Sequence, residues 1–251
     1  AVAVHGDFAV VGAYNETNGV ARGAVYLFNR SGTNWIEKAR AYDAEGQVYD
    51  YFGSDVAIWS NDVAVGAPQA GRGAITNGLA FFYRINQDAT ALVLNNIIQD
   101  PAAEAGFAES VAIGSAFAVL GGDSAYVCFR EGTNWVRQIR YQVATSDQFG
   151  KSVGVSERSV AIGAPFDATA GSGAGAVWVY EVEPRNRQDE ARRFDGNSIT
   201  HFGQAVASWS NLVFFGAAGG VTATSGAVYV YRNGGQSWSL QEELYPANRS
   251  N

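Results

Sequence analysis

A segment that recurs along the whole chain is the strongest constraint on its fold. The clearest copy runs from Phe149 to Tyr180 and reads FGKSVGVSERSVAIGAPFDATAGSGAGAVWVY. Two β-branched runs, 152–155 and 160–162, are separated by a gap of the length that closes an antiparallel hairpin. The following Gly-Ala-Pro, 163–165, ends the second strand, because glycine tolerates positive φ and proline cannot donate to a ladder. After a loop rich in Gly, Ala and Thr, a third strand is predicted at 176–180.

The same pattern occurs in four further places. Copies begin at Phe52 and Phe202, a degenerate copy begins at Phe107 with Ala108 in place of the glycine, and an N-terminal copy lacks its Phe-Gly. We divide the chain into repeat units 1–51, 52–105, 106–148, 149–201 and 202–251. Because short repeats bury their apolar residues by stacking, the sequence predicts one all-β domain over residues 1–251, a five-bladed β-propeller of four-stranded antiparallel blades.

These motifs resemble a known family. The Phe-Gly opening, the Gly-Ala-Pro stop, the Gly-Ala-Val-Tyr strand and the Thr-Asn-Trp start of the next strand are similar to the FG-GAP repeats of the integrin alpha-subunit propeller. The resemblance is closer to the secreted and cell-surface branch, which implies an extracellular or cell-surface location. A kelch propeller has a similar period, but its glycine pair is not repeated here.

The integrin repeats carry an acidic calcium loop in some first hairpins, and this chain departs from that pattern. Calcium takes six or more oxygen ligands, and none of the five hairpins supplies them. The hairpins read His5-Gly6-Asp7, Trp59-Ser60-Asn61-Asp62, Gly114-Ser115, Ser156-Glu157-Arg158 and Trp209-Ser210-Asn211. We therefore expect no metal site and no cofactor.

Charge and hydropathy exclude two classes of partner. With 17 basic and 24 acidic residues the net charge is −7, which repels a phosphate backbone, so no nucleic-acid partner is expected. No apolar run approaches the ~20 residues that a membrane helix requires, and no signal-like segment begins at Ala1. We expect a soluble chain without membrane insertion.

Cysteine and tryptophan are assigned to packing. Cys128, the only cysteine, lies in a predicted third strand where the other copies have apolar residues, and is expected to be a buried hydrophobe. Trp35, Trp135 and Trp238 recur at matching repeat positions and are interpreted as packing anchors between blades rather than as a ligand cage.

No catalytic motif is recognisable. The two histidines, His5 and His201, are expected on opposite rims, and there is no nucleophile elbow or phosphate loop. Asp43, Glu45 and Asp50 are what acidic loops normally contain, and we assign them structural or solvating roles. The sequence therefore predicts that the protein is not an enzyme.

The leading hypothesis is a non-catalytic extracellular interaction or scaffold module, used in adhesion or as a surface or fibre subunit. Its partner would be a protein or glycan ligand, or further copies of the chain in a fibre. The alternative is a carbohydrate-binding propeller lectin, favoured by loop aromatics such as Tyr14 but weakened because that position is not repeated as an aromatic.

Variable loops on a rigid scaffold concentrate function, so we expect binding on the face made by the loops after Gly-Ala-Pro and before Phe-Gly. The candidate ligand-binding residues are Tyr49, Tyr51, Arg72, Asp167 and His201. Candidate glycosylation sites, all expected in loops, are Asn15, Asn29 and Asn248. At the chain ends we expect residues 245–251 to pack beside Ala1 and close the ring, the alternative being strand addition from another chain.

Overall fold

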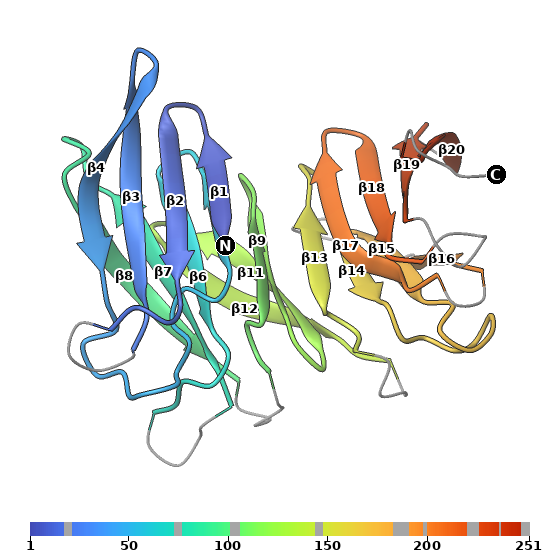
Figure 1. Cartoon of the computed structure of the whole chain (residues 1–251), viewed down its shortest axis with the longest axis horizontal. Coiled ribbons are helices and arrows are strands. Elements are labelled where there is room, and N and C mark those ends of the chain that lie inside the picture. The colour runs from blue at the N-terminus through green and yellow to red at the C-terminus, as the bar shows by residue number, and fades with distance from the viewer. Residues whose placement is uncertain are drawn as a thin grey trace. The chain divides into compact units, whose positions relative to one another are not determined.

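A computed structural model describes residues 1–17, 22–72, 77–100, 106–143, 148–182, 191–197, 200–219, 226–235 and 237–246 (Figure 1). Within these ranges the chain forms twenty strands and no helix. The prediction of an all-β fold is confirmed.

The strands form five four-stranded antiparallel sheets, each built from strands consecutive in sequence, in a propeller-like arrangement. The first sheet contains β1 Val2–His5, β2 Phe8–Ala13, β3 Ala24–Ser31 and β4 Asn34–Ala41. The second contains β5 Val56–Trp59, β6 Asp62–Ala67, β7 Leu79–Ile85 and β8 Leu92–Gln99. The third contains β9 Ser110–Ile113, β10 Phe117–Gly121, β11 Ala125–Glu131 and β12 Asn134–Tyr141. The fourth contains β13 Ser152–Val155, β14 Ser159–Ala164, β15 Ala176–Glu181 and β16 Ala191–Asp195. The fifth contains β17 Phe202–Trp209, β18 Leu212–Ala217, β19 Ala227–Asn233 and β20 Trp238–Leu244.

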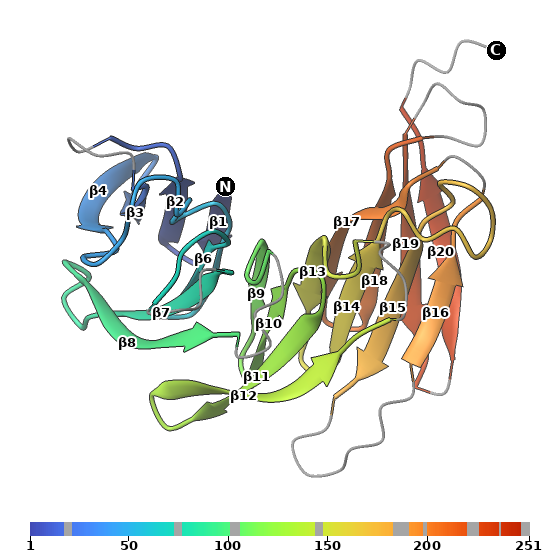
Figure 2. The same ribbon diagram turned by 90° about the horizontal axis from the view of Figure 1, so that it is seen from below.

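The chain divides into two compact units. The first unit comprises residues 1–122 and 126–140, and the second comprises 123–125 and 141–251. In the first unit one core cluster joins Val25 and Leu27 of β3 to Phe81 and Tyr83 of β7. In the second unit, Val177 and Val179 of β15 pack with residues of β17 and β18, the strands that Figure 2 shows beside the fourth sheet.

In the second and fourth sheets a backbone hydrogen bond joins the Phe-Gly and Gly-Ala-Pro motifs. The amide N–H of Gly53 donates to the carbonyl of Gly66 at 2.9 Å, and that of Gly150 donates to the carbonyl of Gly163 at 3.0 Å. Gly150 has φ of 88°, and Ala108, which replaces the glycine in the degenerate copy, has φ of 62°. The first glycine position therefore requires a left-handed backbone even where alanine occupies it.

The glycine of Gly-Ala-Pro also sets the contact with the next sheet. A Cβ added at Gly163 would overlap the carbonyl oxygen of Gly203, and one added at Gly66 would overlap that of Ala108. The motif is thus explained by backbone-to-backbone packing between neighbouring sheets, which only a residue without a side chain permits.

In the first unit, the face of the first sheet that carries Val11, Tyr26 and Phe28 is half-buried. The repeat-equivalent residues of the second sheet, Val65, Phe81 and Tyr83, are at most 4% exposed because they pack in the cluster shared with β3. The outer face of the first sheet is therefore apolar but uncovered within its unit.

In the second unit, the fifth sheet also has a face that no other sheet of its unit covers. Phe214 is half-buried and Val228 is 37% exposed, whereas their repeat equivalents in the fourth sheet, Ala161 and Val177, are fully buried. A hollow of about 480 Å³ lies on this face, lined mainly by apolar groups of β17, β18, β19 and the segment after β20.

The predicted packing residues have different outcomes. Cys128 is fully buried, as expected, and burial raises the pKa of its thiol to about 12. Trp135 is 1% exposed and stacks on Phe82, which confirms its role as an anchor. Trp35, at the matching position of the first sheet, is 43% exposed, because β4 has few neighbours across its outer face.

Candidate binding surfaces

The five predicted ligand-binding residues belong to two groups. Tyr49, Tyr51 and Arg72 lie in the first unit, and Asp167 and His201 lie in the second.

In the first unit Tyr14, Tyr49 and Tyr51 form an exposed cluster, called here the tyrosine cluster. The rings of Tyr14 and Tyr51 meet edge to face at 5.8 Å, and those of Tyr49 and Tyr51 are 6.4 Å apart. Tyr49 is 66% exposed and Tyr14 is 45% exposed. Both Tyr49 and Tyr51 have positive φ, 71° and 56°, a conformation that costs a residue other than glycine ~1–2 kcal/mol. The surrounding loops hold these rings in a defined arrangement despite that cost.

Arg72 is held beside this cluster's loop by two carboxylates. Its guanidinium lies 2.5 Å from the Asp43 carboxylate and 3.2 Å from that of Glu45. Asp43 is 4% exposed, and Asp50, 6% exposed, accepts a hydrogen bond from the amide of Gln47 at 2.6 Å. Burial raises the pKa of Asp50. Asp43 and Asp50 therefore stabilise the loop through their ion pair and hydrogen bond. The guanidinium of Arg72 is paired with Asp43 and Glu45 and is not a free cation.

Asp167 in the second unit is a buried structural acid. It is 2% exposed, and its Oδ1 accepts hydrogen bonds from Arg193 and from the amide of Thr169, each at 2.8 Å. His201 is half-buried, with its ring 5.2 Å from that of Phe166, which is 46% exposed. The predicted face therefore contains Phe166, which sequence reasoning did not select.

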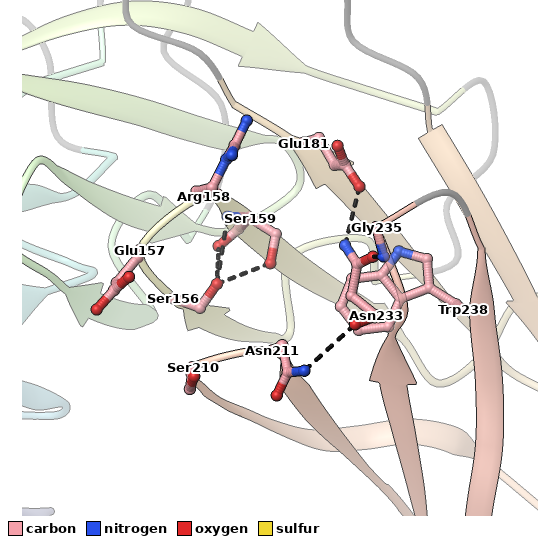
Figure 3. Close-up of a pocket in the computed structure, with 10 residues that line it drawn as sticks. All are labelled: Ser156, Glu157, Arg158, Ser159, Glu181, Ser210, Asn211, Asn233, Gly235 and Trp238. Carbon is pink, nitrogen blue, oxygen red and sulfur yellow. Dashed lines mark hydrogen bonds between the residues drawn. The ribbon is translucent and has the colours of Figure 1, made fainter.

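A polar pocket that the sequence analysis did not predict lies at the other end of the second unit's strands (Figure 3). It has a volume of about 270 Å³ and lies among the hairpin turns rather than the loops after Gly-Ala-Pro. The residues that line it are Ser156, Glu157, Arg158, Ser159, Glu181, Ser210, Asn211, Asn233, Gly235 and Trp238. The charged pair 157–158 in a first hairpin was a signal in the sequence, since no other first-hairpin turn carries two charged residues.

The inner wall of this pocket is fixed by hydrogen bonds. Asn233 Nδ2 donates to Glu181 Oε1 at 2.9 Å, and its Oδ1 accepts from the amide of Gly235 at 2.7 Å. Asn211 Nδ2 donates to the carbonyl of Asn233 at 3.3 Å. Trp238 is half-buried, and its indole Nε1 is shielded from solvent without an acceptor in the described chain. The pocket is thus a preformed polar site with one unsatisfied donor.

The two histidines belong to different units, His5 to the first and His201 to the second. His5 accepts a hydrogen bond at Nδ1 from the amide of Ser60 at 3.1 Å, and its ring packs 4.7 Å from that of Trp59. Among the described residues, no three His, Cys, Asp or Glu side chains are grouped so that they could hold a metal ion. Nor does any helix in the described ranges have the length and hydropathy to span a membrane.

The three sequons lie in different settings. Asn15 is exposed in a turn after β2. Asn29 lies within β3 and donates to the carbonyl of Asp7 at 3.2 Å, so its prediction as a loop residue is wrong, because the third strand extends through it to Ser31. Asn248 lies outside the described residues.

Comparison with known families supports the repeat assignment in two segments. The model of the FG-GAP repeat matches residues 35–83 and 141–180. These two segments are FG-GAP repeats. Each match ends in the third strand of a sheet, at Tyr83 of β7 or Tyr180 of β15, and includes a Phe-Gly and a Gly-Ala-Pro motif. No curated protein matches the chain.

Among solved structures, this chain is similar to a protein from Bacteroides uniformis described as a proposed 6-phosphogluconolactonase. The TM-score is 0.62 at 11% sequence identity, over 95% of this chain and 68% of that one. At this identity the likeness shows the fold alone.

The same neighbour corrects the prediction that the protein is not an enzyme. That prediction rested on missing catalytic motifs, yet a protein of similar fold carries the name of an enzyme. Recognisable motifs are thus an inadequate criterion on this fold, because active sites on one scaffold are built from unrelated residues. The exclusion of catalysis is withdrawn.

Proposed function

We propose that the five sheets are the blades of one closed five-bladed β-propeller, in which the uncovered face of the fifth sheet packs on that of the first. Repeat equivalence supports this. Phe214 and Val228 correspond to residues that the fourth sheet buries under the fifth, and Tyr26 and Phe28 correspond to residues that the second sheet buries against the first. In a closed ring the two uncovered faces would form the two halves of one repeated interface.

Gly216 provides the test of closure. It is the repeat equivalent of Gly163, but a Cβ added there would meet only Ala205 of its own sheet, at 3.4 Å. In a closed ring the backbone of a neighbouring blade fills this space, and Gly216→Ala should destabilise the protein as Gly163→Ala does. With an open face the same change should be neutral, or stabilising by ~0.4–1 kcal/mol.

Sedimentation velocity over a range of concentrations completes the test. A concentration-independent monomer with a destabilised Gly216→Ala variant supports closure. Long assemblies would show that copies of the chain cover each other's faces, and closure would be wrong.

For the function, we propose an interaction module that binds a protein partner through the tyrosine cluster, at the cell surface or outside the cell. The FG-GAP repeats suggest a propeller interaction module, and the cluster supplies the observation that favours a site. Tyrosine is enriched at binding hot spots because its ring offers a large amphipathic contact area with few rotatable bonds. Tyr49, exposed yet fixed at positive φ, is the member most available to a partner.

Adhesion, or a role as a glycosylated surface or fibre subunit, is the setting that we propose for this module. Asn15, exposed in its turn, is the sequon in the described ranges best placed for a glycan. Recovery of the native protein, followed by identification of whatever protein, glycan or further copies of the chain remain attached, tests this setting directly.

The binding test compares Tyr49→Ser with Tyr42→Ser, since Tyr42 is 37% exposed but makes no ring contact with the cluster. For the partner recovered with the native protein, Tyr49→Ser should raise Kd at least about tenfold, the equivalent of ~1.4 kcal/mol. Equal Kd values for wild type and Tyr49→Ser would show that the cluster is not the binding surface.

The alternative function is carbohydrate binding. A separate observation favours it, namely the polar pocket of the second unit, whose lining combines amide, carboxylate and hydroxyl groups beside a tryptophan.

A further inference from the structure

We propose that β8 pairs with β8 of a second copy of the chain, so that two second sheets join edge to edge in a symmetric dimer. The inference goes beyond the proposed function, because it concerns the outer edge of a sheet and not the tyrosine cluster. β8 is the last strand of its sheet, beside β7, and no other strand of the described chain pairs with it (Figure 2). A strand in this position presents backbone amides and carbonyls to which another strand can pair.

The sequence of β8 differs from that of the other four outer strands. It reads LVLNNIIQ and contains no charged residue. The outer strands β4, β12, β16 and β20 each carry at least two charged residues. Charged side chains on an edge strand discourage pairing with another chain, because pairing would bury them. β8 lacks this protection, and an uncharged apolar run without glycine or proline is typical of strands that pair between chains.

Three apolar residues of β8 are exposed in the first unit. Val93 is 51% exposed, Leu94 is 45% exposed and Ile97 is 38% exposed. In the register with β7, Leu94 lies opposite Tyr83 and Ile97 lies opposite Phe81, and both of these aromatic residues are buried in the core of the unit. Leu94 and Ile97 therefore continue an apolar face to the edge of the sheet, where a further strand would cover them.

The order of residues in β8 is self-complementary about its centre, which identifies a second copy as the partner. The two central asparagines have three apolar residues before them and two after them. In an antiparallel pair centred between the asparagines, Leu94 lies opposite Ile97 of the second copy, and Val93 lies opposite Ile98 of the second copy. Apolar side chains then meet apolar side chains, and no like charges oppose each other.

A bulge makes this register consistent with the two faces of the strand. Residues three apart on a regular strand point to opposite faces, so Leu94 and Ile97 would not normally share one. In β8 the register with β7 shifts at Asn95, which has no partner on β7. The extra residue places Leu94 and Ile97 on the same face, on either side of the bulge. Both members of the proposed dimer carry the same bulge at the centre, so their registers match.

The central asparagines are held away from the edge. Asn95 Nδ2 donates to the carbonyl of Thr133 at 2.9 Å, and Asn96 Nδ2 donates to the carbonyl of Trp135 at 2.8 Å. Both side chains thus reach toward the third sheet, and they leave the direction of the next strand clear.

The symmetry of the contact limits the size of the assembly. Each copy uses the same strand, so the pairing is complete when two chains have met. A contact made mainly by one strand from each copy buries little surface, and interfaces at the small end of the range are weak. We therefore expect a dimer that dissociates on dilution.

Sedimentation velocity of the full chain over a range of concentrations tests the dimer. Wild type should change from monomer to dimer as the concentration rises, without longer assemblies. Ile97→Lys should remain a monomer throughout, because pairing would bury its ammonium group. Val136→Lys is the matched control, since Val136 is likewise 38% exposed but lies on β12, a strand with charges of its own, and this variant should dimerise as wild type does.

Cross-linking tests the register. The double variant Leu94→Cys/Ile97→Cys should give a covalent dimer under mild oxidation, because each new thiol lies opposite one of the second copy. Within one chain the two positions are ~10 Å apart along the strand, which is too far for a disulfide. Leu94→Cys alone should not cross-link, since the two copies of this residue are not opposite each other. The native Cys128 is fully buried and should not react.

Three results would overturn the proposal. The first is a wild-type chain that stays monomeric at every concentration, in which case any partner of this edge would be another protein. The second is a dimer that a folded Ile97→Lys variant does not weaken, and the third is a double cysteine variant that forms no covalent dimer. Ring closure is tested separately, because open faces would still give long assemblies of Ile97→Lys, whereas a closed ring would give a concentration-independent monomer.

Discussion

Gly163 lies against the fifth sheet with no room for a side chain, and substituting it tests the physical basis of the repeat. An added Cβ would overlap the carbonyl oxygen of Gly203 and would also displace the Ser152 hydroxyl. That hydroxyl donates to the same Gly203 carbonyl at 2.8 Å. Gly163→Ala therefore pushes on backbone on both sides and breaks one hydrogen bond between sheets.

The expected loss is the sum of three effects. Overpacking a rigid site costs ~1–3 kcal/mol, and loss of one hydrogen bond costs ~0.5–1.5 kcal/mol. Alanine restricts the unfolded chain, which offsets ~0.4–1 kcal/mol of this. We expect the free energy of unfolding of Gly163→Ala to be lower by about 2–3 kcal/mol, and its Tm by about 4–12 °C.

Urea unfolding followed by circular dichroism, with a thermal scan, measures both quantities. Gly234→Ala is the control, because its Cβ would meet only the Ser237 carbonyl at 3.5 Å, an ordinary contact, and it should stay within ~0.5 kcal/mol of wild type. A Gly163→Ala protein as stable as Gly234→Ala would refute the conclusion that this glycine exists for close packing between sheets.

Three further experiments test other parts of the fold: labelling of Cys128, substitution of Asp55, and comparison of Trp135 with Trp35. Because burial raises the pKa of Cys128 to about 12, its thiol should not react with Ellman's reagent at pH 8 until guanidinium unfolds the protein. The Asp55 carboxylate accepts hydrogen bonds from the backbone amides of Val111, at 2.8 Å, and Val56, at 3.0 Å. Asp55→Asn replaces one of the two accepting oxygens with an NH2 group and should lower the urea-derived free energy of unfolding by ~1–3 kcal/mol. Burial also raises the pKa of Asp55, so its contribution is fullest below the unfolded pKa and is lost as pH rises through the folded one, a dependence that Asp55→Asn should lack. Trp135→Ala should lower thermal stability by ~3–5 kcal/mol, whereas Trp35→Ala, at the matching but 43% exposed position, should cost about 1–2 kcal/mol.

The strands were predictable because the repeat imposes a local rule at each copy. Phe-Gly, a short hairpin and Gly-Ala-Pro recur with the same spacing, so the strand positions in one copy predict the strand positions in the others. Exposure was less predictable, since it depends on which sheet lies next. Trp35 and Trp135 are equivalent in sequence, yet one is half-exposed and the other buried, because only Trp135 stacks on a neighbouring aromatic ring, Phe82.

The candidate sites were harder to predict than the fold. The sequence suggested that Asp167 was a loop acid available to a ligand, but its carboxylate already accepts hydrogen bonds from Arg193 and a loop amide. The polar pocket was missed because it assembles from turns of two sheets, and Glu181 of β15 and Asn233 of β19 come together only where the fourth sheet packs against the fifth. Residues distant in sequence that share no motif cannot be grouped from spacing alone.

The residue before each Phe shows how this fold separates structure from recognition. Tyr51, Gly106, Gln148 and His201 all have positive φ, between 47° and 71°, so the repeat fixes the backbone there whatever the side chain. Only one of the four is glycine, the residue that takes this conformation without strain, and the others bear a cost of ~1–2 kcal/mol each. Each repeat therefore places a different side chain on the same backbone conformation. Rigid scaffolds with variable side chains are the arrangement that proteins commonly use for binding. Strain at Tyr51 therefore belongs to the fold, and its side chain is the part of this position that varies between repeats.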